Sequence, residues 1–424
     1  MYWQIPDSER TYLRELAKKQ AEYAALPVMA RRKQMWFDLN DGRPGTRPPF
    51  LLISGFFDRD FMPESVFRCS SETGRHIERR MLRNVLDHEI LNDDKVVPDA
   101  FDIDWFTDID AMGVRIEQEN IADSQGVNTG FRLKNPIKNL KEDFHILKPA
   151  VCRVDKQRTL AWQAFLEDLF GGVLPVRLIT GVYGCGSLTY DAFALMGMEA
   201  FYMAMYDQPD EVHRLMAYLR DNGLRIMHWA EDNGLLRLNN RFQLCGAGVT
   251  QAYTHRLPSP GYEGPAARLC DMAGGANSQE TVGISPQMYH EFCFPYYRDL
   301  CAPLGQTYYG CCEPAHPLWD DIRQMPHLRK VSISRWCDER IMAEALRGTE
   351  IVFSRKPSPN FLGLDRELNE AAWSAHIRQT LETTRGCLAE FIVCDVYTVH
   401  GNLAKARHAV ELARAEIDKY YDPC

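Results

Sequence analysis

The chain has 424 residues, of which 45% are hydrophobic and 25% charged, as expected of a folded protein with a large buried core. Its net charge of −9 at pH 7 argues against a nucleic-acid partner, because such a partner calls for a basic surface. The sequence contains no run of roughly 18 apolar residues, so no membrane-spanning helix is expected.

The cysteine content and the N-terminal residues both bear on the compartment. The 13 cysteines are an odd number without regular spacing. The first residues, Met1-Tyr2-Trp3-Gln4, lack the cationic and apolar regions of a signal peptide. Both features favour a reducing compartment, and we therefore expect a cytoplasmic enzyme.

Helical spacing of apolar and charged residues predicts a helix over residues 8–40, and the Gly- and Pro-rich stretch 42–49 ends it. We interpret residues 1–48 as a helical extension and residues 49–424 as the main domain. The apolar run that starts this domain predicts a buried strand over Leu51–Ser54. Residues 56–165 predict a long excursion over one end of the domain.

From about residue 170, short apolar runs alternate with helical patterns. The predicted strands are Val176–Gly181, Arg237–Leu244, Ala267–Met272, Gln306–Tyr309, Leu328–Ser334, Glu350–Ser354 and Glu390–Val396. Most are separated by helices, the last of which is Leu403–Tyr421. With Leu51–Ser54 this makes eight strands, and such alternation predicts an α/β fold: a (β/α)8 TIM barrel with parallel strands.

In such barrels the active site lies at the C-terminal ends of the strands. Four predicted strand ends carry reactive side chains: Asn277-Ser278-Gln279-Glu280, Tyr308 to Glu313, Ser354-Arg355-Lys356-Pro357, and Cys394-Asp395 with His400 shortly after. Two cysteine-bearing strand ends and a carboxylate are therefore expected at the same end of the predicted barrel.

Cysteine thiolates bind zinc well, and a catalytic zinc uses three protein ligands and keeps one position open. Cys312 and Cys394 with one further ligand would fit. Glu280 is the first choice for that ligand, and the alternatives are Cys311, Glu313 and His400. On the residues alone, adjacent cysteines also fit plain packing, Glu280 also fits a helix cap, and Arg355 also fits an ordinary rim charge.

Residues 170–415 resemble the uroporphyrinogen decarboxylase superfamily. The stretches that carry the resemblance are Asn277 to Pro286, Phe292 to Tyr297, Tyr309-Gly310-Cys311-Cys312-Glu313-Pro314, Arg329 to Ser334, and Phe353 to Pro357. True decarboxylases of this superfamily carry an arginine-rich segment near the first strand. Here that strand end reads Ser54-Gly55-Phe56-Phe57-Asp58-Arg59, with one arginine, which argues against porphyrinogen decarboxylation.

The other branch of the superfamily contains corrinoid-dependent methyltransferases, with a zinc site made by His-x-Cys on one strand end and Cys on a later one. Carried over, the first cysteine corresponds to Cys312 and the later one to Cys394. The histidine position is Gly310, which cannot bind a metal, and this departure makes Glu280 attractive as the third ligand. The pattern looks like the subgroup that demethylates aryl methyl ethers.

The resemblance implies an O-demethylase that uses zinc to move a methyl group from a small methoxylated substrate to a cob(I)alamin corrinoid. The corrinoid would belong to a partner protein, because the chain has no DxHxxG motif of its own. Glu280 or Tyr309 would supply a proton to the leaving oxygen. Related barrels often dimerise, which leaves a homodimer open. Candidate residues for the substrate pocket are Phe56, Phe57, Tyr183, Tyr308, Trp336 and Arg355.

Three alternatives remain. A methylcorrinoid:thiol methyltransferase would run the transfer in the other direction. A cofactor-free decarboxylase, like uroporphyrinogen decarboxylase, would need a cationic rim, to which Arg59, Arg355 and Lys356 would contribute. A barrel that binds a corrinoid or tetrapyrrole without turnover is the third.

Overall fold

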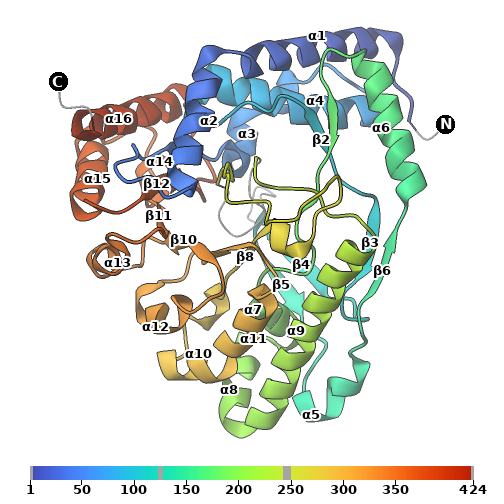
Figure 1. Cartoon of the computed structure of the whole chain (residues 1–424), viewed down its shortest axis with the longest axis vertical. Helices are drawn as coiled ribbons and strands as arrows, with labels where there is room; N and C mark the ends of the chain where they lie inside the picture. The colour runs from blue at the N-terminus through green and yellow to red at the C-terminus, as the bar shows by residue number, and fades with distance from the viewer. Residues whose placement is uncertain (1–2, 123–127, 242–249, 422–424) are drawn as a thin grey trace.

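The computed structural model describes residues 3–122, 128–241 and 250–421. Its largest sheet has six parallel strands in the order β1-β12-β11-β10-β9-β8 (Figure 1). The strands are β1 (Phe50–Leu52), β8 (Ala273–Ala276), β9 (Gln306–Tyr309), β10 (Leu328–Ile333), β11 (Val352–Arg355) and β12 (Ala389–Val393). The prediction of an α/β chain with parallel strands is confirmed.

Helices follow these strands, as the alternating pattern predicts. They are α10 (Pro286–Phe292), α11 (Phe294–Cys301), α12 (Trp319–Ile322), α13 (Glu339–Leu346), α14 (Asn360–Gly363), α15 (Glu370–Thr383) and α16 (Leu403–Tyr421). In Figure 1, α15 and α16 lie side by side beyond β12. Val331, Phe353 and Phe391, on the helix-facing side of the sheet, belong to the large apolar cores.

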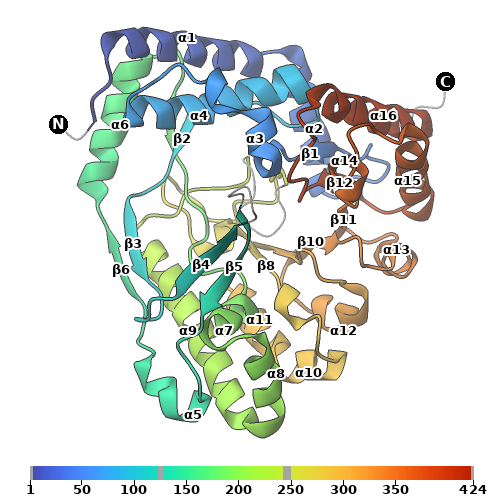
Figure 2. The same cartoon turned by 180° about the vertical axis from the view of Figure 1, so that it is seen from behind.

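A second parallel pair, β2 (Phe101–Ile103) and β7 (Val176–Leu178), forms a separate small sheet. β2 lies inside the predicted excursion, which also holds three short helices and two antiparallel ladders, the latter lying near each other in Figure 2. These elements are α3 (Asp58–Phe61), α4 (Glu72–Leu86) and α5 (Leu140–Asp143), with β3 (Thr107–Asp110) paired to β6 (Val151–Val154) and β4 (Glu117–Ala122) to β5 (Asn128–Lys134).

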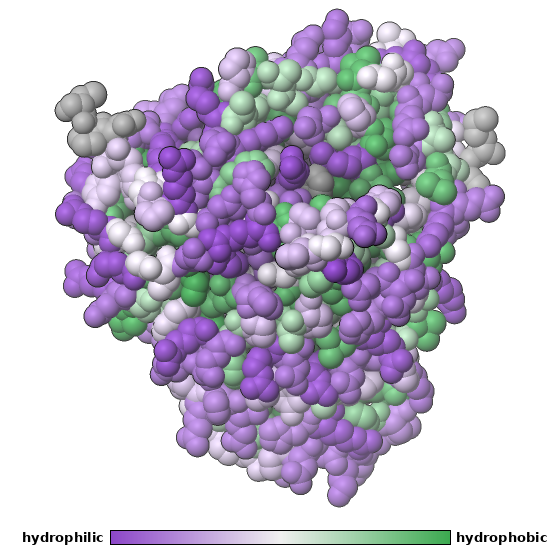
Figure 3. All heavy atoms as spheres, viewed as in Figure 1, coloured by the Kyte–Doolittle hydropathy of each residue, from purple (hydrophilic) through white to green (hydrophobic). Residues whose placement is uncertain are grey.

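The predicted N-terminal helix is two helices, α1 (Asp7–Ala24) and α2 (Pro27–Asn40). The break falls at Leu26, which is extended because the ring of Pro27 disfavours helical backbone in the residue before it. The remaining helices are α6 (Lys156–Phe170), α7 (Leu188–Met196), α8 (Met198–Asp207) and α9 (Pro209–Asp232). On the face in Figure 3, hydrophilic residues cover most of the surface and apolar ones form small patches.

The strand prediction needs two corrections. Of the predicted strand Arg237–Leu244, residues 237–241 form no strand, and residues 242–244 lie outside the described part of the chain. Residues 267–272 are also not a strand: Leu269–Asp271 is a 3-10 turn, and the strand starts at Ala273. In the turn, the Asp271 carboxylate accepts from the Arg268 backbone N–H and side chain, which stabilises a turn rather than a ladder.

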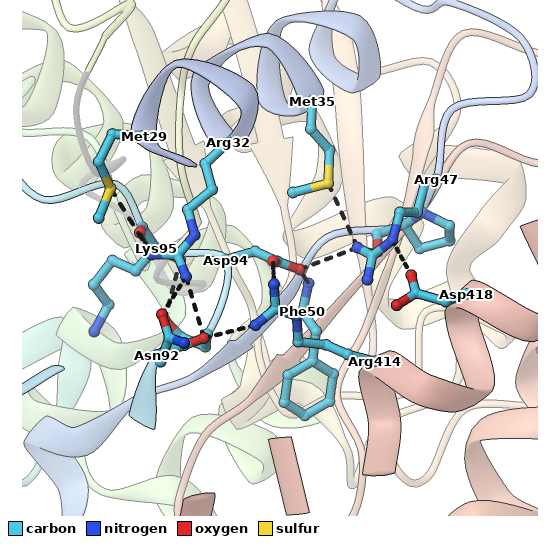
Figure 4. Close-up of polar contacts among 12 residues, drawn as sticks. Met29, Arg32, Met35, Arg47, Phe50, Asn92, Asp94, Lys95, Arg414 and Asp418 are labelled. Carbon is cyan, nitrogen blue, oxygen red and sulfur yellow. Dashed lines mark hydrogen bonds and ion pairs between the residues drawn. The ribbon is translucent and has the colours of Figure 1, made fainter. Parts of the chain in front are cut away.

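The outer edge of β1 bonds to side chains instead of a neighbouring strand (Figure 4). Asp94 accepts a hydrogen bond from the Phe50 N–H at 2.9 Å and pairs with Arg47 and Arg414. Asp93 accepts from the Leu52 N–H at 2.9 Å. Since β1 ends the six-stranded sheet here and β2 pairs only with β7 among the described residues, closure of eight strands into one barrel is not shown.

The sheet face opposite the helices carries a buried polar network. The Lys330 ammonium lies 2.7 Å from the Glu390 carboxylate, and both side chains are nearly inaccessible. Glu390 also accepts from Ser354, whose hydroxyl accepts from Tyr308 and from Lys356. The network therefore joins strands β9, β10, β11 and β12 across the sheet.

No helix among the described residues is long and apolar enough to cross a membrane.

Glu390→Gln should destabilise the fold by about 3–5 kcal/mol, because it leaves the Lys330 ammonium buried without its anion. Glu350→Gln is the matched control: Glu350 pairs with Arg256 and Arg329 at the surface, where such pairs contribute about 1 kcal/mol or less. Urea unfolding of both variants measures the difference. Equal midpoints would show that the buried pair does not stabilise the sheet.

Candidate metal and methyl-transfer site

Two cysteines from different strand ends meet at one carboxylate. Cys312 lies three residues after β9, and Cys394 directly follows β12. Their sulfur atoms are each 3.6 Å from the same oxygen, Oδ2 of Asp395. Because parallel strands present their C-terminal ends at one edge, residues 82 positions apart in sequence come together here.

Two unusual backbone conformations shape this corner. Gly310 has φ +96°, and a Cβ atom built there would lie 3.1 Å from the Ser332 side chain. A side-chain ligand at position 310 would therefore be strained, which agrees with the absence of a histidine there. Asp395 has φ +60°, a rare value for a residue other than glycine, and such outliers concentrate at functional sites.

The thiols differ in how easily they lose a proton. A hydrogen bond from the Cys311 thiol lowers the pKa of Cys312, and the two sulfur atoms are 3.6 Å apart. Burial raises the pKa of the Cys394 thiol to about 12, although Lys356 acts in the opposite direction. Cys312 is thus the more readily ionised of the two predicted ligands.

Two of the distances in this corner are close to those of a zinc ligand set. With Zn–S near 2.3 Å and Zn–O near 2.0 Å, a tetrahedral site puts sulfur and oxygen ligands about 3.5 Å apart. The two S···O distances are 3.6 Å. As placed, no three His, Cys, Asp or Glu side chains among the described residues are arranged to hold a metal ion, so zinc binding here stays a prediction.

The two predicted glutamates have other partners. Glu313 accepts from the backbone N–H groups of Ser278 and Cys311, so both of its oxygens are in use. Glu280 accepts from the hydroxyl groups of Ser187 and Thr189 at 3.0 and 2.8 Å. Glu280 makes no hydrogen bond to Cys312 or Cys394, and its role as third ligand stays a prediction.

Adjacent tyrosines of β9 point to opposite faces of the sheet. The Tyr309 hydroxyl is enclosed with those of Ser278 and Tyr289, at 2.5 and 2.7 Å, and burial raises its pKa well above the ordinary value. The Tyr308 hydroxyl lies on the other face and accepts from the Lys356 ammonium at 2.7 Å. Tyr308 is therefore linked to the cysteine corner through Lys356, whereas Tyr309 faces the helices.

Of the other predicted residues, the structure brings only Trp336, which is 65% exposed, to the cysteine pocket. Arg355 points to the helices and pairs with Glu339 at 2.5 Å. Phe56 packs on Tyr397 and, like Cys394, against the apolar cluster that includes Leu51 and Ile392. The other three do not line the pocket: Phe57 is buried against Phe61, Tyr183 donates to Asp104, and the His400 ring lies 3.1 Å from the Gly363 carbonyl.

Sequence reasoning named Asp395 only as part of a strand end and Lys356 only as a rim charge of the decarboxylase alternative, and it assigned neither to the metal site. Both line the cysteine pocket, together with Cys311, Ser334, Arg335, Pro357 and Pro359. Asp395 follows Cys394 directly, and this adjacency was the available signal. Lys356 could not be found this way, because its direction depends on the pleat of β11 and on the position of Tyr308.

Comparison with known proteins gives information on the fold. No family model and no curated protein sequence matches the chain. Among solved structures, a methyltransferase from Methanosarcina mazei matches with a TM-score of 0.50 over 92% of this chain and 99% of that chain. The sequences are 13% identical, so the likeness concerns the fold alone. The chain thus shares the architecture of at least one methyltransferase.

A buried carboxyl next to Glu280 should make stability depend on pH. Burial and the neighbouring Glu280 raise the pKa of Asp191 from 3.8 to about 7. The folded chain then keeps a proton that the unfolded chain releases near pH 4, so stability falls as the pH rises from about 4 to about 7. Asp191→Asn should remove this loss, up to about 4 kcal/mol at ~1.4 kcal/mol per pKa unit.

The measurement is denaturant unfolding of the wild type and Asp191→Asn at about pH 4.5 and about pH 8. The variant should be the more stable at the higher pH, with a smaller difference at the lower one. Asp232→Asn, at the exposed end of α9, is the control and should show no such trend. A pH-independent difference for Asp191→Asn would contradict the assigned titration.

Proposed function

We propose that this chain is a zinc-dependent methyltransferase of the O-demethylase type. It would move a methyl group from a small methoxylated aromatic substrate to the cob(I)alamin of a separate corrinoid protein. The observation that carries the proposal is the approach of the Cys312 and Cys394 sulfurs to one Asp395 oxygen. The shared architecture with a methyltransferase supports it.

Cys312, Cys394 and Asp395 would hold the zinc, with Glu280 as the alternative oxygen ligand. Asp395 is favoured because its carboxylate is already within 3.6 Å of both sulfurs, whereas Glu280 is engaged by Ser187 and Thr189. Two thiolates and one carboxylate would leave one position open for substrate. When bound, zinc would act as a Lewis acid that polarises the ether oxygen.

The positive charge of Lys356 would help Cys394 to lose its proton and bind the metal. Burial alone would lower its pKa, but Tyr308, Cys394 and Glu390 raise it above the ordinary value, so the side chain keeps its positive charge at neutral pH. A fixed positive charge beside Cys394 favours the thiolate that metal binding requires. The Tyr308 hydroxyl, 2.7 Å from the ammonium, holds Lys356 in place.

The transfer breaks the methyl C–O bond and leaves an aryl oxide that needs one proton. Lys356 lines the pocket and carries a proton that it could donate, while Glu280 and Tyr309 are the donors predicted from the sequence. The cysteine pocket itself has a volume of only about 20 Å³, so an aromatic ring would lie outside it. Trp336, exposed at its rim, offers a flat face to that ring or to the corrinoid.

Cys394→Ala should abolish zinc binding, from about one ion per chain to a trace, because two ligands rarely retain the metal. Asp395→Asn should weaken it at least about tenfold. Cys152→Ala, in β6 of the β3–β6 ladder, is the matched control and should keep its zinc. Metal analysis after dialysis, with circular dichroism to confirm folding, provides the readout. Full zinc occupancy in folded Cys394→Ala would refute the ligand set.

Activity is tested separately with methoxylated aromatic compounds and a reduced corrinoid protein. The zinc-loaded chain should convert cob(I)alamin absorbance to that of methylcobalamin only when a methyl donor is present. Cys394→Ala should lose this conversion by at least about 100-fold, and Cys152→Ala should retain it. Methylation of a thiol from methylcorrinoid, without demethylation of any ether, would instead assign the reverse type of transferase.

A further inference from the structure

A cavity with charged walls lies away from the cysteine pocket. It has a volume of about 510 Å³, within the usual range for small-molecule sites. Its described walls come from α4, from residues 95–102 leading into β2, from β7 and the residues just after it, and from Arg241, Gln251 and Tyr253. It shares no described lining residue with the cysteine pocket.

The cavity walls are cationic in a chain of net charge −9. Six lining side chains are basic and two are acidic. The basic residues are Arg79, Arg80, Arg83, Lys95, Arg177 and Arg241, and the acidic ones are Asp99 and Asp102. Such a surplus of positive charge makes the local potential positive and attracts anions.

Four of the six cations already have an anionic partner. Arg79 and Arg83 pair with Asp58 at 3.0 and 2.6 Å, and Lys95 pairs with Asp87 at 2.6 Å. The fourth, Arg177, lies 2.7 Å from Asp102 and 3.0 Å from Asp99. These charges are structural, and the two acidic walls are neutralised by Arg177.

Arg80 and Arg241 have no hydrogen bond or ion pair through their guanidinium groups among the described residues. The Arg80 guanidinium lies over the Phe101 ring at 4.9 Å, which fixes its plane but leaves its N–H groups available. Both side chains are exposed; burial lowers the pKa of Arg80, while the charges of Asp102 and Asp104 act in the opposite direction. Among the described residues, both arginines thus present unpaired donors to one space.

The rest of the lining indicates what the occupant looks like. Val96, Pro98, Ala100 and Ile179 supply apolar surface, and Gln251 and Tyr253 supply neutral polar groups. A planar guanidinium binds carboxylate or phosphate oxygens in a bidentate fashion. The apolar walls suit a compact organic body attached to such a group.

We propose that this cavity is a binding site for a small organic anion, whose carboxylate or phosphate group is held by Arg80 and Arg241. The other four basic residues are paired with carboxylates and would not contact the ligand directly. This site is independent of zinc and of the cysteine pocket, so the inference does not depend on the proposed methyl transfer.

The test uses the full chain and three probes: benzoate, phenyl phosphate and inorganic phosphate, each titrated by calorimetry at low ionic strength. We expect at least one to bind, and Arg80→Gln and Arg241→Gln each to weaken that binding about tenfold or more. Arg340→Gln, an exposed arginine on α13, is the matched control and should bind as the wild type does. Thermal melts of the unliganded variants check that they remain folded.

The probes separate the sources of the oxyanion. Binding of benzoate alone would identify a carboxylate site, and binding of both phosphates alone a phosphate site; binding of phenyl phosphate without inorganic phosphate would show that the apolar walls contribute. Absence of binding by all three probes would overturn the proposal. So would folded Arg80→Gln and Arg241→Gln proteins with wild-type affinity, or an equal loss in Arg340→Gln.

Discussion

The candidate site depends on one buried ion pair, between the Lys330 ammonium and the Glu390 carboxylate. Each charge would be costly inside the protein without the other. Through Ser354 the pair connects to Tyr308 and Lys356, so four neighbouring strands share one polar network. The member of this network that lines the cysteine pocket is Lys356, which lies beside Cys394. The charge that favours a thiolate at the strand ends is thus held by a chain of contacts that begins within the sheet.

Above this network, strand direction determines which residues meet. All six strands of the main sheet are parallel, so the segments after β9 and β12 emerge at the same edge. Left-handed backbone at Gly310 and Asp395 then turns the chain sharply at both ends. These turns bring the two sulfurs toward one carboxylate oxygen. With the proposed ligand set, two thiolates and one oxygen ligand would leave one position open, which would suit Lewis-acid chemistry better than nucleophilic catalysis by a side chain.

Strands β1 and β2 belong to different sheets, and the segment that joins them has a second role. Asp93 and Asp94 take up the backbone N–H groups of β1, so this strand needs no neighbour on that side. Lys95, the next residue, lines the cationic cavity together with residues of α4, β2 and β7. The same short segment that ends the sheet therefore also forms a wall of the proposed anion site. Side chains here bond the backbone N–H groups of β1 that a neighbouring strand would otherwise bond, and this unpaired edge lies next to the charged cavity.

The sequence by itself determined the α/β class, the strands from β9 to β12, and the two cysteine-bearing strand ends, because hydrophobic periodicity and turn residues are local signals. It misplaced the strand before Ala273, where side-chain bonds of Asp271 stabilise a turn. It also missed β2, whose three residues lie within a polar stretch. Only the tertiary structure decided that Arg355 faces the helices while Lys356 faces the cysteines, since adjacent residues of a strand point to opposite faces. The tertiary structure likewise decided which groups surround Asp395, Arg80 and Arg241, because those groups come from segments far apart in the chain.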